Sequence, residues 1–179
     1  MQLLECRLVI DDLDAFVTEL GAIGDRHGVT IQAFDARNVA DRQHLERAVD
    51  LADRAIERDE NVARDRAIEL LLYAAGRRQI DRAFEMGLTA GPGTQAAVIL
   101  IAGRPDRESE SESESDREDA AIDELAALDS VVSVEPTLDA SDPKTLCAFF
   151  EITDVERSAT DAPLGALVRE RVALLDVEK

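Results

Sequence analysis

The chain has 179 residues, of which 45% are hydrophobic, and its 39 acidic and 20 basic residues give a formal net charge of −19. This length suits one domain with a real core, because a domain of about 150 residues buries roughly two-thirds of its unfolded surface. No apolar run approaches the ~20 residues of a membrane span, and the start lacks the basic flank of a signal peptide, so we expect a soluble, cytoplasmic protein without membrane contact.

The charged residues have an unusual composition, with very few lysines. Only Lys144 and Lys179 are lysines, and all other basic residues are arginines. This balance is typical of halophilic proteins that work in molar potassium chloride, where carboxylates keep the surface hydrated and salt screens charges beyond about 3 Å. The acidity therefore indicates habitat rather than a partner, and it counts only weakly against nucleic-acid binding.

The front of the chain predicts a strand, a helix, a second strand and a long helix. Residues 3–10 form the first strand, and Asp11 or Asp12 caps a helix whose apolar residues recur at helical spacing. Residues 29–34 alternate as a strand does. From 41 to 58 a single apolar stripe with charged residues elsewhere predicts an amphipathic helix.

Residues 61–88 are the most informative stretch. A helix that is apolar on nearly every side ends at Gly76, and Arg77, Arg78, Gln79 and Ile80 follow it before a short second helix. A helix without a polar face is buried all round, so it can fix the residues that come directly after it. Between residues 64 and 82 five arginines face three acids, a local net charge of +2 in a strongly acidic chain.

The back of the chain predicts a second strand–helix–strand unit and further helices. Residues 87–94 form a turn region, and 96–102 is a continuous apolar run typical of an inner strand. Residues 103–119 alternate Glu with Ser and predict a flexible acidic loop insertion, with a functional acidic tail as the alternative. The remaining elements are a helix at 120–128, an edge strand at 131–136, and helices at 143–150 and from 163.

These elements together indicate an α/β fold class. The prediction is a single domain of residues 1–179 with a small mixed β-sheet of four strands, packed with helices that include the buried central one.

No group of residues indicates catalysis. The sequence contains no nucleophile elbow, no Walker loop and no HExxH motif, and its two histidines, His27 and His44, stand apart from the cysteines. Cys6 and Cys147 lie in apolar surroundings and are expected to be buried reduced thiols, with a disulfide or a metal pair as the alternative. We expect a protein that is not an enzyme and that holds no cofactor and no metal.

The arginine-rich stretch admits two interpretations. In one, its arginines offset neighbouring acids or satisfy the last carbonyls of the central helix, and Gly76 simply ends that helix. In the other, the arginines hold phosphates or stack on bases, Gln79 reads a base edge and Ile80 offers an apolar platform. Single-stranded nucleic acid suits the second interpretation, because its unpaired bases can splay onto such a surface.

The block Glu69–Ile80 fits the pattern E-[IL]-L-x-Y-x-x-G-x-R-Q-I. With Gln43–Ile56 before it and Leu167–Val177 near the C-terminus, it resembles the small kinase-binding (TPRKB-type) subunit of the KEOPS complex, over most of the chain except the Glu-Ser loop. The resemblance implies a regulatory subunit without catalytic activity, in a complex for tRNA processing that installs threonylcarbamoyladenosine (t6A). It also implies direct binding to the kinase-like ATPase subunit and indirect contact with the transferase subunit.

The resemblance further implies that the chain binds tRNA through its single-stranded CCA 3′ end. The tRNA-binding positions of the family match Arg64, Gly76, Arg77, Arg78, Gln79 and Ile80, where lysine is usual at the position of Arg64. The kinase contact is open between the helix at 43–56 and the last helix. Two rival hypotheses remain: a purely protein–protein module that activates the kinase-like subunit without RNA contact, and a small enzyme of unknown substrate.

Overall fold

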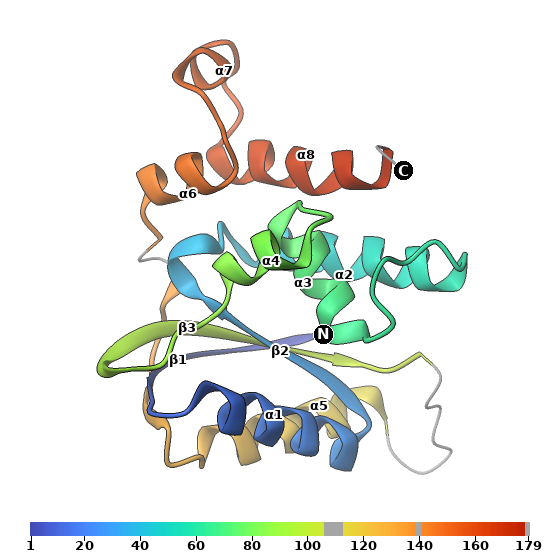
Figure 1. Cartoon of the computed structure of the whole chain (residues 1–179), viewed down its shortest axis with the longest axis vertical. Coiled ribbons are helices and arrows are strands. Elements are labelled where there is room, and N and C mark those ends of the chain that lie inside the picture. Colours follow the sequence, from blue (N-terminus) through green and yellow to red (C-terminus); the bar gives the residue numbers. More distant parts are fainter. Residues whose placement is uncertain (106–112, 139–140, 178–179) are drawn as a thin grey trace. The chain divides into compact units, whose positions relative to one another are not determined.

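The structure is a computed structural model that describes residues 1–105, 113–138 and 141–177 (Figure 1). Its contacts divide the chain into two compact units, Met1–Asp35 with Leu88–Thr137 and Ala36–Gly87 with Leu138–Lys179. Both units are discontinuous in sequence, because residues 36–87 interrupt the first unit. Among the described residues, no helix combines the length and the apolar character needed to cross a membrane.

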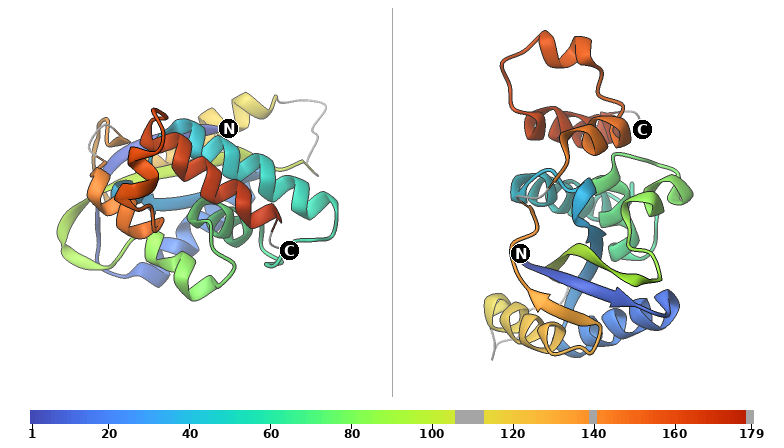
Figure 2. Two further views of the ribbon diagram at one scale, coloured as in Figure 1. Left: turned by 90° about the horizontal axis from the view of Figure 1, so that it is seen from above. Right: turned by 90° about the vertical axis from the view of Figure 1, so that its left-hand side faces the viewer.

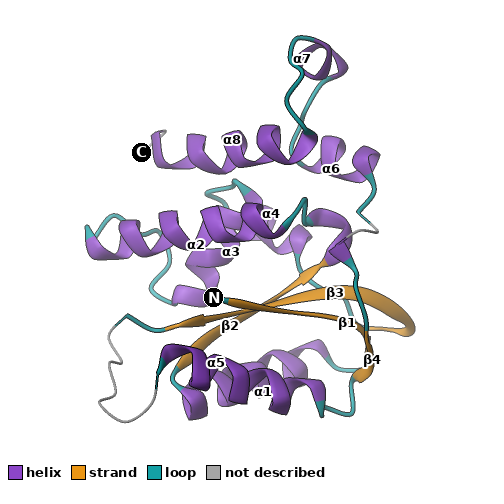
Figure 3. Ribbon diagram, turned by 180° about the vertical axis from the view of Figure 1, so that it is seen from behind, coloured by secondary structure: helices purple, strands orange, loops and turns teal. Residues whose placement is uncertain are grey.

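The first unit is a four-stranded sheet with two helices. Its elements are β1 (Gln2–Ile10), α1 (Leu13–His27), β2 (Val29–Asp35), β3 (Gly91–Gly103), α5 (Glu114–Ala126) and β4 (Val131–Val134). The strand order is β2-β3-β1-β4, and α1 and α5 lie side by side on one face of the sheet (Figure 3). The arrangement is therefore a split β-α-β-β-α-β unit.

The α/β fold class is confirmed, but the sheet is not mixed. β3 pairs with β1 and with β2, and β1 pairs with β4, each time in the antiparallel sense. β1 and β2 still run parallel to each other, as a strand–helix–strand unit requires, but β3 lies between them. The predicted mixed sheet is therefore wrong, because local periodicity reveals a strand but not its neighbour in the sheet.

The core of the first unit lies between the sheet and its two helices. Leu4, Cys6 and Leu8 of β1 alternate inward and pack with Leu20 of α1 and Leu125 of α5. Burial raises the pKa of the Cys6 thiol to about 12, so this cysteine stays protonated. Both cysteines are free; Cys6 is buried as predicted, whereas Cys147 is partly exposed.

Two predicted boundaries are wrong. Residues 106–112 of the expected acidic loop lie outside the described residues, but the helix α5 begins at Glu114 rather than at 120. Ser113 and Asp116 form a capping box there, which the Glu-Ser repeat conceals in the sequence. The strand β3 begins at Gly91, inside the predicted turn, because it continues past a β-bulge to pair with Ile10.

The second unit is helical. Its elements are η1 (Ala36–Asn38), α2 (Arg42–Glu57), α3 (Arg66–Ala75), α4 (Ile80–Ala83), η2 (Phe84–Met86), α6 (Pro143–Phe149), α7 (Asp154–Ser158) and α8 (Leu164–Val177). Seen from above, α8 runs alongside α2 (Figure 2). The short helix α7 was not predicted; a capping box of Thr153 and Glu156 begins it.

The prediction of a buried central helix is confirmed. Every residue of α3 from Glu69 to Ala75 is buried, including the large side chain of Tyr73. The helix contacts α2, α4 and α8 within its unit. Because α3 is packed on several sides, the backbone position of the residues that follow its C-terminus is fixed.

Candidate functional site

The two ends of α3 have defined caps. Asp65 accepts hydrogen bonds from the backbone N–H groups of Ala67 (2.7 Å) and Ile68 (3.2 Å) at the N-terminus. Gly76 ends the helix in the left-handed conformation, with φ +59°, and a Cβ added to it would lie 3.4 Å from the carbonyl oxygen of Arg171 on α8. That distance is an ordinary van der Waals contact, so the glycine is required by its backbone angles rather than by the approach of α8.

His44, on α2, supports the last turn of α3 from inside the unit. Its Nε2 lies 2.8 Å from the carbonyl oxygen of Ala74, and its Nδ1 accepts a hydrogen bond from the backbone N–H of Ala40. A carbonyl can only accept, so the ring is neutral with its proton on Nε2. Desolvation lowers the pKa of this fully buried imidazole to about 4. His44 thus satisfies a carbonyl that the helix end leaves without a partner.

The turn before α3 is held by the buried side chain of Glu69. One carboxylate oxygen of Glu69 accepts hydrogen bonds from the backbone N–H groups of Val62 (3.1 Å) and Ala63 (2.8 Å). Asn61 closes the same turn by donating to the carbonyl of Ala63. These hydrogen bonds give a physical reason for the glutamate at the first position of the block Glu69–Ile80. They also fix the backbone of the turn that carries Arg64.

Arg77 connects the exit of α3 to α6. Its Nη2 donates to the carbonyl oxygen of Phe149 (2.6 Å) and pairs with the carboxylate of Glu151 (3.0 Å). Its guanidinium carbon also lies 6.0 Å from the centre of the Phe149 ring. A cation at a helix C-terminus is favoured by the helix dipole. Arg77 is therefore engaged within the unit.

Arg171 holds the same end of α6 from the side of α8. It donates to the carbonyl oxygens of Phe150 and Glu151 and pairs with Glu156. The N–H of Thr153 and the guanidinium of Arg171 hold the pKa of Glu156 down at about 2, so the pair stays charged at any ordinary pH. Arg77 and Arg171 together fix the segment that follows α6.

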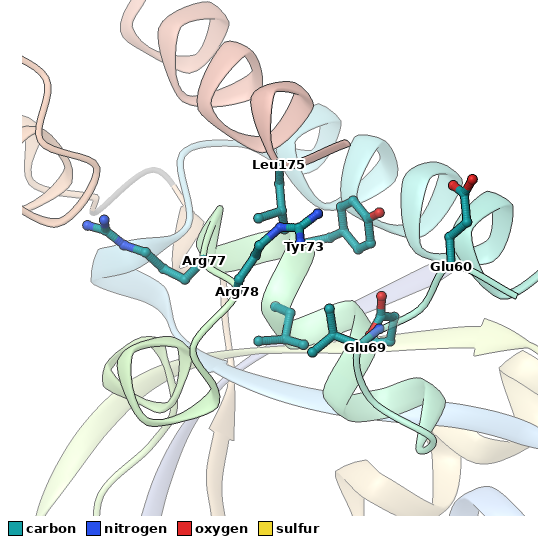
Figure 4. A pocket seen from close by; sticks show the side chains of 8 residues that line it. Glu60, Glu69, Tyr73, Arg77, Arg78 and Leu175 are labelled. Carbon is teal, nitrogen blue, oxygen red and sulfur yellow. The ribbon is translucent and has the colours of Figure 1, made fainter. Parts of the chain in front are cut away.

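Arg78 is placed differently from Arg77. The two side chains diverge, and Arg78 points along a small hollow lined by Val62 from the turn before α3, Tyr73 of α3 and Leu175 of α8 (Figure 4). The Nε of Arg78 is buried, and no described residue accepts a hydrogen bond from it. The hollow has about 10 Å³ of free volume, which is the space of roughly one water molecule. A ligand at this place must therefore bind on the outer surface.

Gln79, Ile80 and Phe84 are exposed on the short helical segment after Arg78. Gln79 is exposed and makes no capping hydrogen bond with its side chain, although it stands at the start of α4. The N–H of Phe84 bonds to the carbonyl of Ile80, so the two side chains lie on one face of a helical turn. Ile80 is 38% exposed and Phe84 is 53% exposed. We call Arg78, Gln79, Ile80 and Phe84 the exit surface.

The other arginines of the stretch differ in their ion pairs. Arg66 makes a bidentate pair with Asp53 of α2, with distances of 2.7 and 2.8 Å, which is a structural contact between helices. Arg82 lies 3.7 Å from Glu85, and both side chains are largely exposed, so this pair is weak. Arg64 is exposed and forms no ion pair with any carboxylate of the described residues.

The predicted site residues thus separate into groups. Arg78, Gln79 and Ile80 lie together on the exit surface, Gly76 shapes the backbone before them, and Arg64 is exposed on the turn whose Val62 shares the hollow with Arg78. Arg77 instead faces α6. Sequence reasoning missed Phe84, although its position four residues after Ile80 was a usable signal. It also missed the supporting roles of His44 and Glu69, which need tertiary structure to be seen.

The two candidate helices for a kinase contact use their apolar stripes within the unit. Leu45 and Ala52 of α2 are buried, as are Val168 and Val172 of α8, and the two helices contact each other. Both stripes therefore belong to the core of this unit. An apolar stripe on a helix is more often core than interface, and that holds for both of these.

No curated protein matches the chain in a sequence comparison. A family model described as "Kinase binding protein CGI-121" matches residues 17–176, a range that runs from α1 to α8 and includes α3 with its exit. The resemblance to a kinase-binding subunit is thereby confirmed, and the chain belongs to the CGI-121 family of kinase binding proteins.

Proposed function

We propose that this protein is a non-catalytic KEOPS subunit that binds the kinase-like ATPase subunit and recruits tRNA through its single-stranded CCA 3′ end. In this assignment the transferase subunit installs the threonylcarbamoyl group, and the present chain contacts it only through the kinase-like subunit. The present chain delivers the tRNA substrate in the cytoplasm. Kinase binding follows from the family; the recruitment of tRNA rests on the exit surface.

The observation that carries the proposal is a cation that has no partner among the described residues and that is followed in the chain by an exposed apolar face on a rigid support. Arg78 forms no ion pair with a described carboxylate, and Ile80 and Phe84 follow it on one exposed face. A guanidinium such as that of Arg78 binds phosphates, and unstacked bases pack on an apolar face such as that of Ile80 and Phe84. Because α3 and its caps already fix the backbone, little conformational entropy is lost on binding.

The test compares intact tRNA with tRNA trimmed of its CCA end, in molar potassium chloride, by a direct binding measurement. We expect the intact tRNA to bind and the trimmed tRNA to lose most of that affinity. Equal binding to both, or no binding to either, would refute recruitment through the CCA end. The chain would then act as a kinase-docking module, and its arginine-rich stretch would be structural.

The second candidate function is this purely protein–protein module, which activates the kinase-like subunit without touching RNA. The exposed apolar pair Ile80 and Phe84 also suits a protein partner. The two functions differ in their dependence on salt. Contacts with phosphates weaken steadily as salt rises, whereas apolar contacts with a protein do not.

Arg77 and Arg78 are expected to act differently on RNA binding. Each is replaced by glutamine, and the logarithm of the binding constant is measured against the logarithm of the salt concentration. If Arg78 contacts a phosphate, its loss reduces the slope by about 0.7, the value for one phosphate of a single strand. Arg77 is held by Phe149 and Glu151, so its loss lowers the affinity without changing the slope. Equal changes of slope in both variants would contradict this assignment.

A further inference from the structure

Phe84 stands out among the exposed apolar side chains. The large apolar residues that are exposed in the described part of the chain are Val17, Val62, Ile80, Phe84, Val132, Val134, Val155 and Leu174, and Phe84 is the only aromatic one among them. Single exposed apolar residues are normal on protein surfaces and need no explanation by themselves. The question is therefore whether the surroundings of Phe84 favour one occupant.

The backbone around Phe84 is anchored, although its ring is exposed. Ala83 before it and Met86 after it are fully buried, and the side chain of Asn38 donates to the carbonyl oxygen of Glu85 at 3.3 Å. The N–H groups of Arg82 and Ala83 bond to the carbonyl of Gln79. The ring thus sits on a fixed support and has only two side-chain torsions to order, which suits a stacking platform.

The charges near Phe84 indicate which part of a nucleotide it meets. Asp81 and Glu85 are both exposed and follow Ile80 and Phe84 by one residue each. The exposed Arg82 lies 3.7 Å from Glu85 and offsets one of the two charges, so the strip beside the apolar face has a net charge of −1 (two acids and one arginine). A phosphate next to these carboxylates would be repelled, whereas the uncharged face of a base would not. Arg78, which has no ion-pair partner among the described residues, precedes this strip in the chain and points along the hollow lined by Tyr73 and Leu175 (Figure 4). The phosphates therefore belong near Arg78 and the base belongs on Ile80 and Phe84.

We infer that Phe84 is a base-stacking residue, on which an unpaired nucleobase of the bound 3′ end lies, with Ile80 beside it. This inference rests on the proposed function and adds a residue and a mode of contact to it. Stacking is tolerant of sequence, because every base has a π-face. In this arrangement Arg78 contacts the phosphodiester chain, and Ile80 and Phe84 contact a base that is unstacked from its neighbours.

The experiment uses the full chain with two substitutions and tRNAs in which each of the three 3′-terminal nucleotides is made abasic in turn. Phe84→Leu keeps the apolar character but removes the ring, and Phe84→Tyr keeps the ring. We expect Phe84→Leu to bind intact tRNA about tenfold more weakly and Phe84→Tyr to bind like the parent protein. The loss caused by Phe84→Leu should vanish with the tRNA that is abasic at the stacked position.

Two results would overturn the stacking role. In the first, Phe84→Leu binds intact tRNA with the affinity of the parent protein. In the second, Phe84→Leu loses the same affinity for each of the three abasic tRNAs as for intact tRNA, which would mean that the ring does not contact a base. In both cases the proposed function stands if the parent protein still requires the CCA end. If the parent protein binds intact and trimmed tRNA equally, the proposed function fails and the stacking role fails with it. A thermal unfolding midpoint of Phe84→Leu equal to that of the parent protein would confirm that the variant is folded.

Discussion

Replacing Ile80 by glutamate is expected to abolish binding of tRNA by its CCA end while the protein remains folded. The side chain is 38% exposed, so a glutamate at this position can reach solvent with its carboxylate. Ile80 is also the first residue of α4, where an acidic side chain is tolerated because the helix N-terminus is positive. On the RNA side, the change removes the apolar contact on which a base packs and adds a carboxylate next to that of Asp81, beside the negatively charged 3′ end. Together these effects amount to about 3 kcal/mol, a loss of roughly a hundredfold.

The control for this experiment is Val17→Glu. Val17 is exposed on α1, and its replacement makes the same change of charge at a position outside the exit surface. We expect this variant to bind tRNA like the parent protein. Both variants should retain the parent far-ultraviolet circular dichroism spectrum. If Ile80→Glu unfolds, Ile80 belongs to the core; if it folds and still binds tRNA, Ile80 lies outside the RNA contact.

The second large effect is expected from the buried imidazole of His44, as a loss of stability in mild acid. Its pKa is 6.5 in the unfolded chain and about 4 in the folded protein, because burial disfavours the charged form. Asp41 raises this pKa and Arg169 lowers it, and the two groups pair with each other at 2.7 Å. Between pH 6.5 and pH 4 the unfolded state binds the extra proton, so stability is complete above pH 6.5 and falls as the pH drops. The loss is about 3 kcal/mol.

The measurement is the free energy of unfolding by denaturant from pH 7 to pH 4, at constant molar potassium chloride. The matched variant is His44→Gln, which retains an N–H donor for the carbonyl of Ala74 but has no proton to gain. We expect the difference between the two proteins to shrink steadily from pH 6.5 to pH 4. A constant difference over this range would show that His44 is protonated in the folded protein as easily as in the unfolded chain.

The local elements of this fold were largely readable from the sequence. The strands β1 and β2 and the helices α1, α2, α3, α6 and α8 lie where the apolar periodicity and the caps predict them, and the apolar run 96–102 forms the second half of the longer strand β3. Their signals are local, since a cap or an apolar stripe involves residues within a few turns of each other. The antiparallel pairing of the sheet and the interleaving of the two units were not readable, because they depend on contacts between distant segments.

For the candidate site, the sequence by itself determined that a buried helix ends at Gly76 and presents a short, net-basic segment. Tertiary structure alone decided the use of each side chain in that segment. Arg77 and Arg78 are adjacent and chemically identical, yet Arg77 pairs with the end of α6 while Arg78 has no partner among the described residues. The carbonyl of Phe149 and the carboxylate of Glu151, which fix Arg77, stand more than seventy positions away in the chain, beyond the reach of any local pattern.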